Sequence, residues 1–456
     1  MSTFPPLSPE LVARLDMPGP RYTSYPTVPA WSASFGSDDY VRALAVASAS
    51  ARATEPLSLY VHIPFCREMC SYCGCNVIVA KDPGKADRYL SFLARESARI
   101  GAVLGTGRSL ARLHLGGGTP TFLSEKQLES LWRTVTSAFA IGDHAEVAVE
   151  IDPCVTSRGQ LSLLRGLGFN RLSMGVQDLD PRVQALSGRI QSLETTRSVF
   201  SACRELGYSS INMDLIYGLP GQQPDSWRKT IEQVIAMRPD RIAAFSFAYL
   251  PEAKPHQRRL PAGEIPRGLA KLELLRLAHD GLVEAGYRAI GMDHFALPGD
   301  ELAQAQEQRT LWRDFQGYTT LRATDTLALG ITGIGSVGGA FVQTTKSLVR
   351  YQTDLEAAHL PIERGHWLSP DDRRRREAIT QLMCNCWVDL GEDGQDYFAD
   401  ELRALAKLEE DGLVVRDGAQ LSVTALGRVF IRNVAMVFDA YLAKQRDDNR
   451  RFSRTV

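Results

Sequence analysis

Four of the eight cysteines fall within ten residues, at Cys66, Cys70, Cys73 and Cys75 of the segment YVHIPFCREMCSYCGCN. The spacing is CxxxCxxCxC, and it follows an apolar run that is typical of a buried strand. Thiolates this close together suit an iron-sulfur cluster, because one loop can wrap three of its corners. Three ligands would leave one iron open to a small molecule, so such a site could do chemistry as well as carry electrons.

Other uses of these thiols stay open at this point. A structural zinc site normally pairs two short knuckles that are about a dozen or more residues apart, and the sequence shows no second knuckle. The CNC run at Cys384 and Cys386 is isolated in an apolar helical stretch, which is typical of buried, inert thiols. A purely structural metal site and unligated thiols are the remaining alternatives for the loop.

The composition is that of an ordinary globular chain. Of the 456 residues, 44% are hydrophobic and 23% are charged, and 52 basic against 53 acidic residues give a net charge of -1. This balance disfavours a nucleic-acid partner, which usually requires a basic excess. The N-terminus shows no basic n-region followed by an apolar h-region, and the glycine-rich run LALGITGIGSVGGAFV is shorter than the roughly 18 apolar residues of a spanning helix. We therefore expect a cytoplasmic protein without a membrane span, where reducing conditions favour metal binding over disulfides.

Short apolar runs alternate with longer stretches in which apolar residues recur every three or four positions. This alternation predicts parallel strands joined by amphipathic helices. We expect at least six strands between about Leu57 and Leu250, in an open or partial α/β barrel, with a doubly wound sheet as the alternative. The apolar runs are LSLYVHI (57–63), ARLHL (111–115), EVAVEI (146–151), RLSMGV (171–176), INMDLI (211–216) and RIAAFSF (241–247).

The segments on either side of these strands have other patterns. Residues 1–55 are rich in proline and serine and indicate an irregular extension with aromatic anchors and one helix. The barrel domain is expected over residues 56–325, and a mainly helical C-terminal domain over residues 326–456, with a small hairpin at LVVRDGAQLSVT. The charge run DDRRRREA is interpreted as the solvated first turns of a helix.

Polar or permissive residues follow the predicted strands at the edge where parallel folds bind their ligands. Three consecutive glycines would let backbone amides approach a ligand closely. Glu150 and Asp214 could accept hydrogen bonds from hydroxyls or an ammonium group, and Arg189 could bind a carboxylate through two hydrogen bonds. Their convergence on the cysteine loop predicts one pocket. The strand-end residues are His62, Gly116, Gly117, Gly118, Glu150, Asp152, Gln177, Asp178, Asp214, Ala248 and Tyr249.

The segment CREMCSYC resembles the CxxxCxxC signature of the radical S-adenosylmethionine (SAM) superfamily, including the aromatic Tyr72 before the third cysteine. The resemblance implies a 4Fe-4S cluster whose open iron chelates the amino and carboxylate groups of SAM. It also implies that Cys66, Cys70 and Cys73 are the ligands and that Cys75 is not.

A longer set of motifs resembles the family of oxygen-independent coproporphyrinogen III oxidases of haem biosynthesis. The set covers almost the whole length: GPRYTSYPT, YVHIPFC, CGCN, HLGGGTPT, EIDP, NRLSMGVQD, DLIYGLP, GMDHFA and FQGYTT. The resemblance implies two SAM molecules, of which the cluster-bound one yields methionine and a 5′-deoxyadenosyl radical. The radical takes a hydrogen from the β-carbon of a propionate, and loss of carbon dioxide and one electron leaves a vinyl group. Two propionates of coproporphyrinogen III react in this way to give protoporphyrinogen IX.

The same resemblance implies contacts at matching positions. The first SAM would contact Tyr60, Tyr72, Gly117, Glu150 and Ile334, and the second would contact Gly118, Thr119, Gln177, Arg189, Asp214 and Ala248. His62, Phe315 and Gln316 match other active-site positions and are assigned to catalysis. The run GITGIGSVGGA around Ile334 is more glycine-rich than the family pattern. No motif identifies the cations that the four carboxylates of the substrate require.

Two paralogous classes are the alternatives: haem chaperones that keep the cluster motif, and radical enzymes that methylate and open haem. Both generally lack the CGCN continuation and the PRYTSYPT extension. We therefore expect a monomeric oxidoreductase that uses coproporphyrinogen III and a low-potential electron donor of unknown identity. We also expect the extension to cover the pocket, so that a protein without residues 1–55 keeps its cluster but loses turnover.

Overall fold

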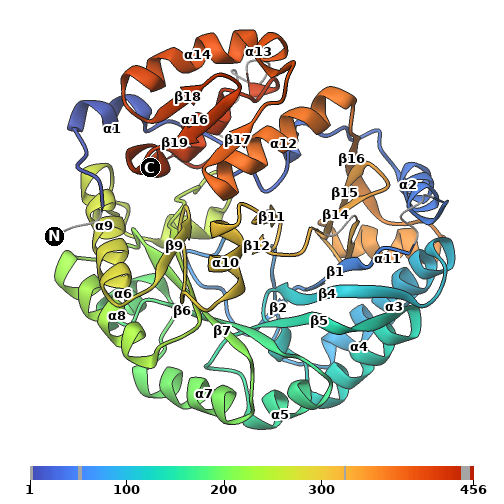
Figure 1. Cartoon of the computed structure of the whole chain (residues 1–456). Helices are drawn as coiled ribbons and strands as arrows, with labels where there is room; N and C mark the ends of the chain where they lie inside the picture. The colour runs from blue at the N-terminus through green and yellow to red at the C-terminus, as the bar shows by residue number, and fades with distance from the viewer. Residues whose placement is uncertain (1–3, 50–53, 323–324, 443–451, 456) are drawn as a thin grey trace.

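The computed structural model describes residues 4–49, 54–322, 325–442 and 452–455 (Figure 1). Most strands lie in one twelve-stranded sheet with the order β16-β15-β14-β13-β1-β4-β5-β6-β7-β8-β10-β9. These strands are β1 (Leu57–Ile63), β4 (Arg108–Gly117), β5 (Phe139–Ile151), β6 (Arg171–Gln177), β7 (Ser210–Tyr217), β8 (Arg241–Ser246), β9 (Arg288–Gly291), β10 (His294–Ala296), β13 (Thr326–Leu329), β14 (Ile334–Val337), β15 (Ala340–Thr344) and β16 (Ile362–Trp367). Separate short pairs are β2 (Phe65–Cys66) with β3 (Ile78–Val79) and β11 (Trp312–Asp314) with β12 (Gly317–Thr319).

The six predicted strands form the centre of the sheet. From β1 through β4, β5, β6 and β7 to β8 they pair in parallel in chain order, each beside the next. Their apolar side chains, such as Leu59, Leu113 and Val149, are buried in one large core. The sheet curls with helices along its outside, and its order runs from β16 to β9 without closing (Figure 1). The predicted partial α/β barrel is therefore confirmed.

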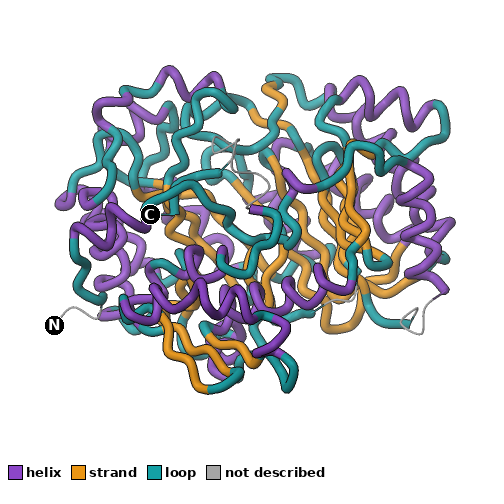
Figure 2. Tube along the Cα trace, turned by 90° about the horizontal axis from the view of Figure 1, so that it is seen from above, coloured by secondary structure: helices purple, strands orange, loops and turns teal. Residues whose placement is uncertain are grey.

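Amphipathic helices connect the parallel strands and cover the outer face of the sheet, and Figure 2 shows them along the periphery of the strands. Their starts are encoded locally: Ser124 and Ser157 form capping boxes with Gln127 and Gln160. No helix in the described ranges is long and apolar enough to span a bilayer. The helices of this part are α3 (Lys85–Leu104), α4 (Glu125–Ala138), α5 (Arg158–Gly166), α6 (Pro181–Ser187), α7 (Leu193–Glu205), α8 (Pro224–Met237), α9 (Leu269–Glu284), α10 (Glu301–Glu307) and α11 (Leu348–Glu356).

The expected domain boundary between residues 325 and 326 is wrong. β13 pairs in parallel with β1, with Leu327 opposite Leu59, and β14, β15 and β16 extend the same sheet as far as Trp367. The apolar run TLAL satisfies backbone groups that would otherwise be unpaired at the edge of β1. The glycine-rich stretch supplies the tight turn between β14 and β15, where Gly338 and Gly339 have φ of +55° and +82°. The sheet-bearing unit therefore ends near Trp367.

The C-terminal unit follows this boundary and packs helices around a three-stranded sheet (Figure 1). The hairpin expected at residues 413–424 is present as β18 (Val414–Asp417) and β19 (Gln420–Val423), and β17 (Trp387–Asp389) adds a third strand. The helices are α12 (Pro370–Asn385), α13 (Gly394–Tyr397), α14 (Ala399–Glu410), α15 (Ala425–Val429) and α16 (Ile431–Met436).

The N-terminal extension has two helices in its described part instead of one, α1 (Pro9–Leu15) and α2 (Ser37–Ala49). The sequence does signal α1, because Ser8 caps it and a proline occupies its first turn. Val12 and Leu15 belong to the hydrophobic core of the C-terminal unit, whereas α2 packs on the barrel core. At Gly338 a Cβ would lie 2.0 Å from the carbonyl oxygen of Ala43 on α2. Deleting residues 1–55 would therefore expose two cores and destabilise the fold, so the expected selective loss of turnover does not follow.

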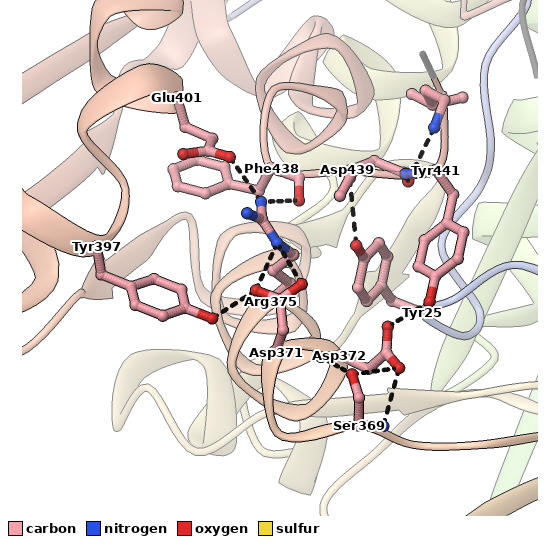
Figure 3. A network of polar contacts seen from close by, with 12 residues as sticks. Tyr25, Ser369, Asp371, Asp372, Arg375, Tyr397, Glu401, Phe438, Asp439 and Tyr441 are labelled. Carbon is pink, nitrogen blue, oxygen red and sulfur yellow. Dashed lines mark hydrogen bonds and ion pairs between the residues drawn. The ribbon is translucent and has the colours of Figure 1, made fainter. Parts of the chain in front are cut away.

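The charge run at the start of α12 is partly buried, not solvated as expected. In Figure 3, Arg375 donates to Asp371 (3.0 Å) and Glu401 (2.7 Å), and Tyr441 donates to Asp372 (2.8 Å). Asp372 is only 2% exposed. The run thus fixes α12 to other parts of the C-terminal unit, which an amphipathic pattern on one helix could not reveal.

Candidate active site

A cavity of ≈ 1020 Å³ lies at the carboxyl ends of the central strands and continues along the inner face of the sheet. The seventeen residues assigned to metal, cofactor or catalytic roles all line it, as does Asp152, whereas the strand-end residues Gly116, Asp178 and Tyr249 do not. The predicted convergence on one pocket thus holds for the seventeen. They are Tyr60, His62, Cys66, Cys70, Tyr72, Cys73, Gly117, Gly118, Thr119, Glu150, Gln177, Arg189, Asp214, Ala248, Phe315, Gln316 and Ile334.

The cysteine loop is held at both ends, because β2 before it pairs with β3 after it. All eight cysteines of the chain are free thiols. The three of the CxxxCxxC motif are partly buried, whereas Cys75 is exposed. Cys384 and Cys386 are buried, and burial raises the pKa of each, as expected for inert thiols.

The thiols of the loop differ in how readily they ionise. Burial raises the pKa of Cys66 to about 11, and its Sγ lies 3.5 Å from Thr119 Oγ1. The side-chain interaction with Cys75 lowers the pKa of Cys73, and the same interaction raises the pKa of Cys75. Cys73 is therefore the thiol of this pair that ionises more readily.

The segment after β8 holds the backbone of the loop, and sequence reasoning missed it. Three side chains donate to three loop carbonyls: Lys254 to Cys75 (3.2 Å), His256 to Cys73 (2.8 Å) and Gln257 to Tyr72 (3.0 Å). Because a carbonyl only accepts, the Nε2 atom of His256 carries a proton. His256 and Cys73 are 183 positions apart, so no local sequence pattern could have paired them.

The glycine run ends β4 in a place too tight for side chains. A Cβ at Gly116 would lie 2.7 Å from Glu150 Oε1, and one at Gly117 would lie 2.6 Å from the His62 ring. A Cβ at Gly118 would lie 2.7 Å from the backbone carbonyl oxygen at residue 65. Gly117 also has a φ of +116°. These residues therefore form a cradle whose backbone is open to the cavity.

Glu150 presents an ionised carboxylate beside this cradle. It accepts hydrogen bonds from His114 Nε2 (2.9 Å) and from the backbone N–H of Gly117 (3.1 Å). Burial alone would raise the pKa of Glu150, but these hydrogen bonds outweigh it and hold the pKa below its usual value. Tyr60 stacks on His114 with ring centroids 5.8 Å apart. His114 was not identified from the sequence, where it is one histidine within an apolar strand.

His62 braces the loop and is neutral. Its Nε2 lies 3.1 Å from the carbonyl of Asn76, and its Nδ1 lies 3.0 Å from Tyr60 Oη. Since the carbonyl only accepts, Nε2 carries the proton and Nδ1 accepts from the tyrosine. Burial lowers the pKa of His62, which favours this neutral form. Both ring nitrogens are thus engaged within the protein.

Arg189 lies beside the cluster loop with its guanidinium already bonded. Nη1 pairs with Asp152 Oδ2 (3.0 Å) and lies 3.9 Å from Cys70 Sγ, while Nη2 donates to the carbonyl of Gly175 (2.9 Å) and to Gln191 (3.0 Å). Asp152 was expected only as a strand-end residue without an assigned role, and Gln191 was not identified from the sequence. Together these contacts fix the arginine at the cavity wall.

Asp214 lies on β7 with its carboxylate held by neighbours. Ser173 and Asn212 donate to its two oxygens over 2.8 and 2.7 Å. Burial still raises the pKa of Asp214 to about 6. Gln177, at the end of the neighbouring β6, has a φ of +67° next to a register shift, an uncommon backbone state for this residue type. Both side chains therefore sit on the same wall as Arg189.

The N-terminal extension lies behind one wall of the cavity. Trp31 packs with Phe315 and Ile334, and the ring centroids of Trp31 and Phe315 are 6.0 Å apart. Within the described ranges, residues 4–49 contribute nothing to the lining. The expectation that the extension covers the pocket is thus wrong for these residues, which support the wall from outside.

The inner end of the cavity is charged, and no sequence pattern indicated it. Three arginines on three strands pair with four carboxylates, so the positive charge of each arginine is neutralised within the protein. The pairs are Arg112 with Glu146 (3.2 Å) and Asp314 (2.9 Å), Arg171 with Glu146 (3.2 Å) and Glu301 (2.5 Å), and Arg241 with Asp300 (2.8 Å) and Glu301 (3.1 Å).

This donor set fits a 4Fe-4S cluster with one open corner, because three free thiols of one loop face a cavity. The glycine cradle and the nearby carboxylates suit a ligand that carries an ammonium group and hydroxyls.

Comparisons with known proteins agree with this geometry. The Radical SAM superfamily model matches residues 60–234, and the HemN C-terminal domain model matches residues 368–430. Oxygen-independent coproporphyrinogen III oxidases are 43% identical in Pseudomonas aeruginosa, over 98% of both chains, and 41% identical in Synechocystis, over 100% of both. The solved structure of coproporphyrinogen III oxidase (HemN) from Escherichia coli, a radical SAM enzyme, has a TM-score of 0.88 at 42% identity, and the match covers 92% of this chain and 97% of that one.

Proposed function

The chain belongs to the family of oxygen-independent coproporphyrinogen III oxidases, and we propose that it converts two propionates of coproporphyrinogen III to vinyl groups in haem biosynthesis. The product is protoporphyrinogen IX. The observation that carries this is the placement of three free thiols, the glycine cradle and the partly buried carboxylates of Glu150 and Asp214 on one cavity. The haem-chaperone and haem-opening alternatives are not favoured, because the relatives that match over the full length are named as oxidases.

The cysteines of the CxxxCxxC motif would hold the cluster, which together with SAM supplies the radical chemistry when bound. The role of the polypeptide is then to place groups and to keep water out. Gln257 serves the first purpose, because it donates to the carbonyls of Tyr72 (3.0 Å) and Ala248 (3.1 Å) and so ties the loop to the end of β8.

The first SAM subsite is proposed between the loop and the glycine cradle, with Tyr60, Tyr72, Gly117, Glu150 and Ile334. Glu150 is ionised and can accept from an ammonium group or a hydroxyl, and Gly117 lines the cavity with its backbone. His114 holds the carboxylate in place, so its contribution is orientation.

A second SAM subsite is proposed along β6 and β7, with Gly118, Thr119, Gln177, Arg189, Asp214 and Ala248. What supports it is the presence of two acceptor groups on different strands, Glu150 on β5 and Asp214 on β7, each with its own hydrogen-bond donors. Arg189 adds a cation between the loop and this wall. Phe315 and Gln316 form the turn of the β11–β12 hairpin on another side of the cavity, where they would contact substrate.

The test is an anaerobic assay of protein reconstituted with iron and sulfide, supplied with dithionite, SAM and coproporphyrinogen III. We expect protoporphyrinogen IX, with one carbon dioxide and one 5′-deoxyadenosine released for each propionate converted. Cleavage of SAM without any vinyl product would overturn the assignment. Tight haem binding in place of turnover would instead support the chaperone alternative.

We further propose that the enzyme acts in the cytoplasm as a monomer and takes electrons from a low-potential donor. Eight free thiols agree with a reducing compartment. Light scattering of the purified protein and cell fractionation test these two points, and a dimer or a membrane-bound pool would contradict them.

A further inference from the structure

His294 faces the cavity from the strand that follows the last parallel one. β10 pairs with β8 so that His294 is opposite Ala243, and Ala243 in turn is opposite Asp214 on β7. Residues opposite one another in a sheet point to the same face. Asp214 and His294 therefore flank a small alanine, and both line the cavity.

The imidazole of His294 is fixed on one side. Its Nδ1 lies 2.8 Å from Asp293 Oδ1, and Asp293, with a side chain only 4% exposed, also pairs with Arg21 of the GPRYTSYPT motif. Because the carboxylate accepts, Nδ1 carries a proton. Phe245 and Tyr318 pack edge-on against the ring, with centroids 5.5 and 5.0 Å away.

The other nitrogen of this ring, Nε2, is available to a ligand. No hydrogen bond within the described part of the chain engages it. A Cβ at position 317 would lie 3.9 Å from Nε2, so Gly317 leaves the approach from the β11–β12 hairpin open.

The other cationic or basic side chains of the cavity are already bonded to groups of the protein, with one exception. Four arginines are ion-paired with carboxylates, and the rings of His62 and His114 bond to groups of the protein. The exception is Arg67, which is exposed on the cysteine loop. The cationic or ionisable basic side chains of the lining are Arg67, Arg112, Arg171, Arg189, Arg241, His62, His114 and His294.

We infer that His294, positioned by Asp293 and Arg21, binds a propionate carboxylate of the porphyrinogen substrate through Nε2. The inference rests on the proposed function, since it concerns the substrate of that reaction. An imidazolium backed by a carboxylate can donate a charge-assisted hydrogen bond to a second carboxylate, and such bonds are the strong ones. Four substrate carboxylates require donors in a cavity where four of the five arginines of the lining are paired with carboxylates of the protein.

The experiment compares His294→Phe and His294→Gln with the parent, each reconstituted with its cluster. Phenylalanine keeps the packing with Phe245 and Tyr318 but removes both nitrogens, whereas glutamine retains an uncharged N–H donor. We expect His294→Phe to raise the KM for coproporphyrinogen III about 10- to 100-fold, the range for losing one hydrogen bond to a charged group. His294→Gln should recover part of this loss. Iron content and the dithionite-driven release of 5′-deoxyadenosine without substrate should equal those of the parent.

A matched control is His279→Phe, the same change at a histidine that also neighbours an aspartate but lines a separate cavity of ≈ 450 Å³. Its KM should equal that of the parent. Asp293→Asn should raise the KM less than His294→Phe, because it removes the charge behind the ring and keeps an acceptor.

The outcomes separate this inference from the proposed function. A parent without oxidase activity would overturn the proposed function itself. A parent that turns over, with an unchanged KM in His294→Phe, would overturn the role of His294. Reduced SAM binding or SAM cleavage in His294→Phe would also overturn it, since the residue would then serve the cofactor beside Asp214.

Discussion

Asp152 Oδ2 lies 3.0 Å from Arg189 Nη1, and both side chains are largely buried, with 21% and 15% exposure. The same guanidinium donates to Gly175 and Gln191, so it is held before any ligand binds. Preorganised in this way, Arg189 offers a fixed positive charge at the wall between Cys70 and Asp214, at little entropic cost to the complex.

This relationship leads to the prediction for the second SAM. Arg189→Ala should keep its cluster and bind about one SAM where the parent binds two, with loss of oxidase activity. Removing one partner of a buried charge pair costs on the order of 2 to 5 kcal/mol, enough to empty a micromolar site at ordinary concentrations. Anaerobic equilibrium dialysis with labelled SAM gives the stoichiometry.

Asp152→Asn is the matched control, because it removes the carboxylate that pairs with Arg189 and keeps the guanidinium. It should retain more SAM binding than Arg189→Ala. Two molecules bound by Arg189→Ala, or one by the parent, would contradict the two-SAM proposal.

The ligand set of the cluster is tested by cysteine variants. Replacing Cys66, Cys70 or Cys73 by alanine should abolish cluster binding, since each removes one thiolate from a cluster without a spare ligand. Cys75→Ser should retain the cluster, because the three thiolates of the CxxxCxxC motif remain in place. Iron and sulfide analysis with the visible spectrum decides this, and an iron-free Cys75→Ser protein would refute the assignment.

The segment after β8 should set how well the loop retains its cluster. His256→Ala removes the 2.8 Å hydrogen bond to the carbonyl of Cys73, a loss of about 1 kcal/mol if water replaces it poorly. We expect faster cluster loss during exposure to a chelator, with the initial iron content unchanged. Arg258→Ala is the control, since Arg258 is exposed and pairs with Glu252 at the surface. Equal rates of cluster loss in the two variants would show that the segment after β8 does not hold the cysteine loop.

Stability should depend on pH through Glu96, a buried residue of α3 outside the cavity. It accepts from the backbone N–H of Gly330 and from Tyr351 Oη, both at 2.7 Å, and burial raises its pKa from 4.5 to about 7. Between these values the folded state keeps a proton that the unfolded state has released, so stability falls as pH rises through this window, by on the order of 3 kcal/mol.

Glu96→Gln should remove this pH dependence while keeping an acceptor for Gly330 and Tyr351. Urea unfolding of the cluster-free protein at pH values from 4.5 to 7.5 measures the effect. Glu129→Gln, at an exposed carboxylate of α4, is the control and should leave the pH dependence of the free energy of unfolding unchanged. If the free energy of unfolding of Glu96→Gln depended on pH as steeply as that of the parent, the prediction would be refuted.

The local pattern of the sequence determined the six central strands and the place of the cysteine loop. Runs such as LSLYVHI match a strand residue for residue, because their side chains alternate between two faces. Leu59, Val61 and Ile63 enter the core, whereas Tyr60 and His62 line the cavity. Thiol spacing, the glycine run and the polar strand ends are also short-range signals. Parallel pairing brings the strand ends to one edge, so residues such as Gly117, Glu150 and Asp214 converge on one cavity.

Only the tertiary structure decided which partners hold those residues. His256 meets Cys73, Arg21 meets Asp293 and Arg112 meets Asp314 across long sequence separations, and no local pattern encodes which partner each residue has. The boundary after Trp367 was missed for the same reason, since β13 becomes a barrel strand only because the edge of β1 is there to pair with it. Periodicity reports which face of an element is buried, whereas long-range pairing depends on what the folded chain brings to that face.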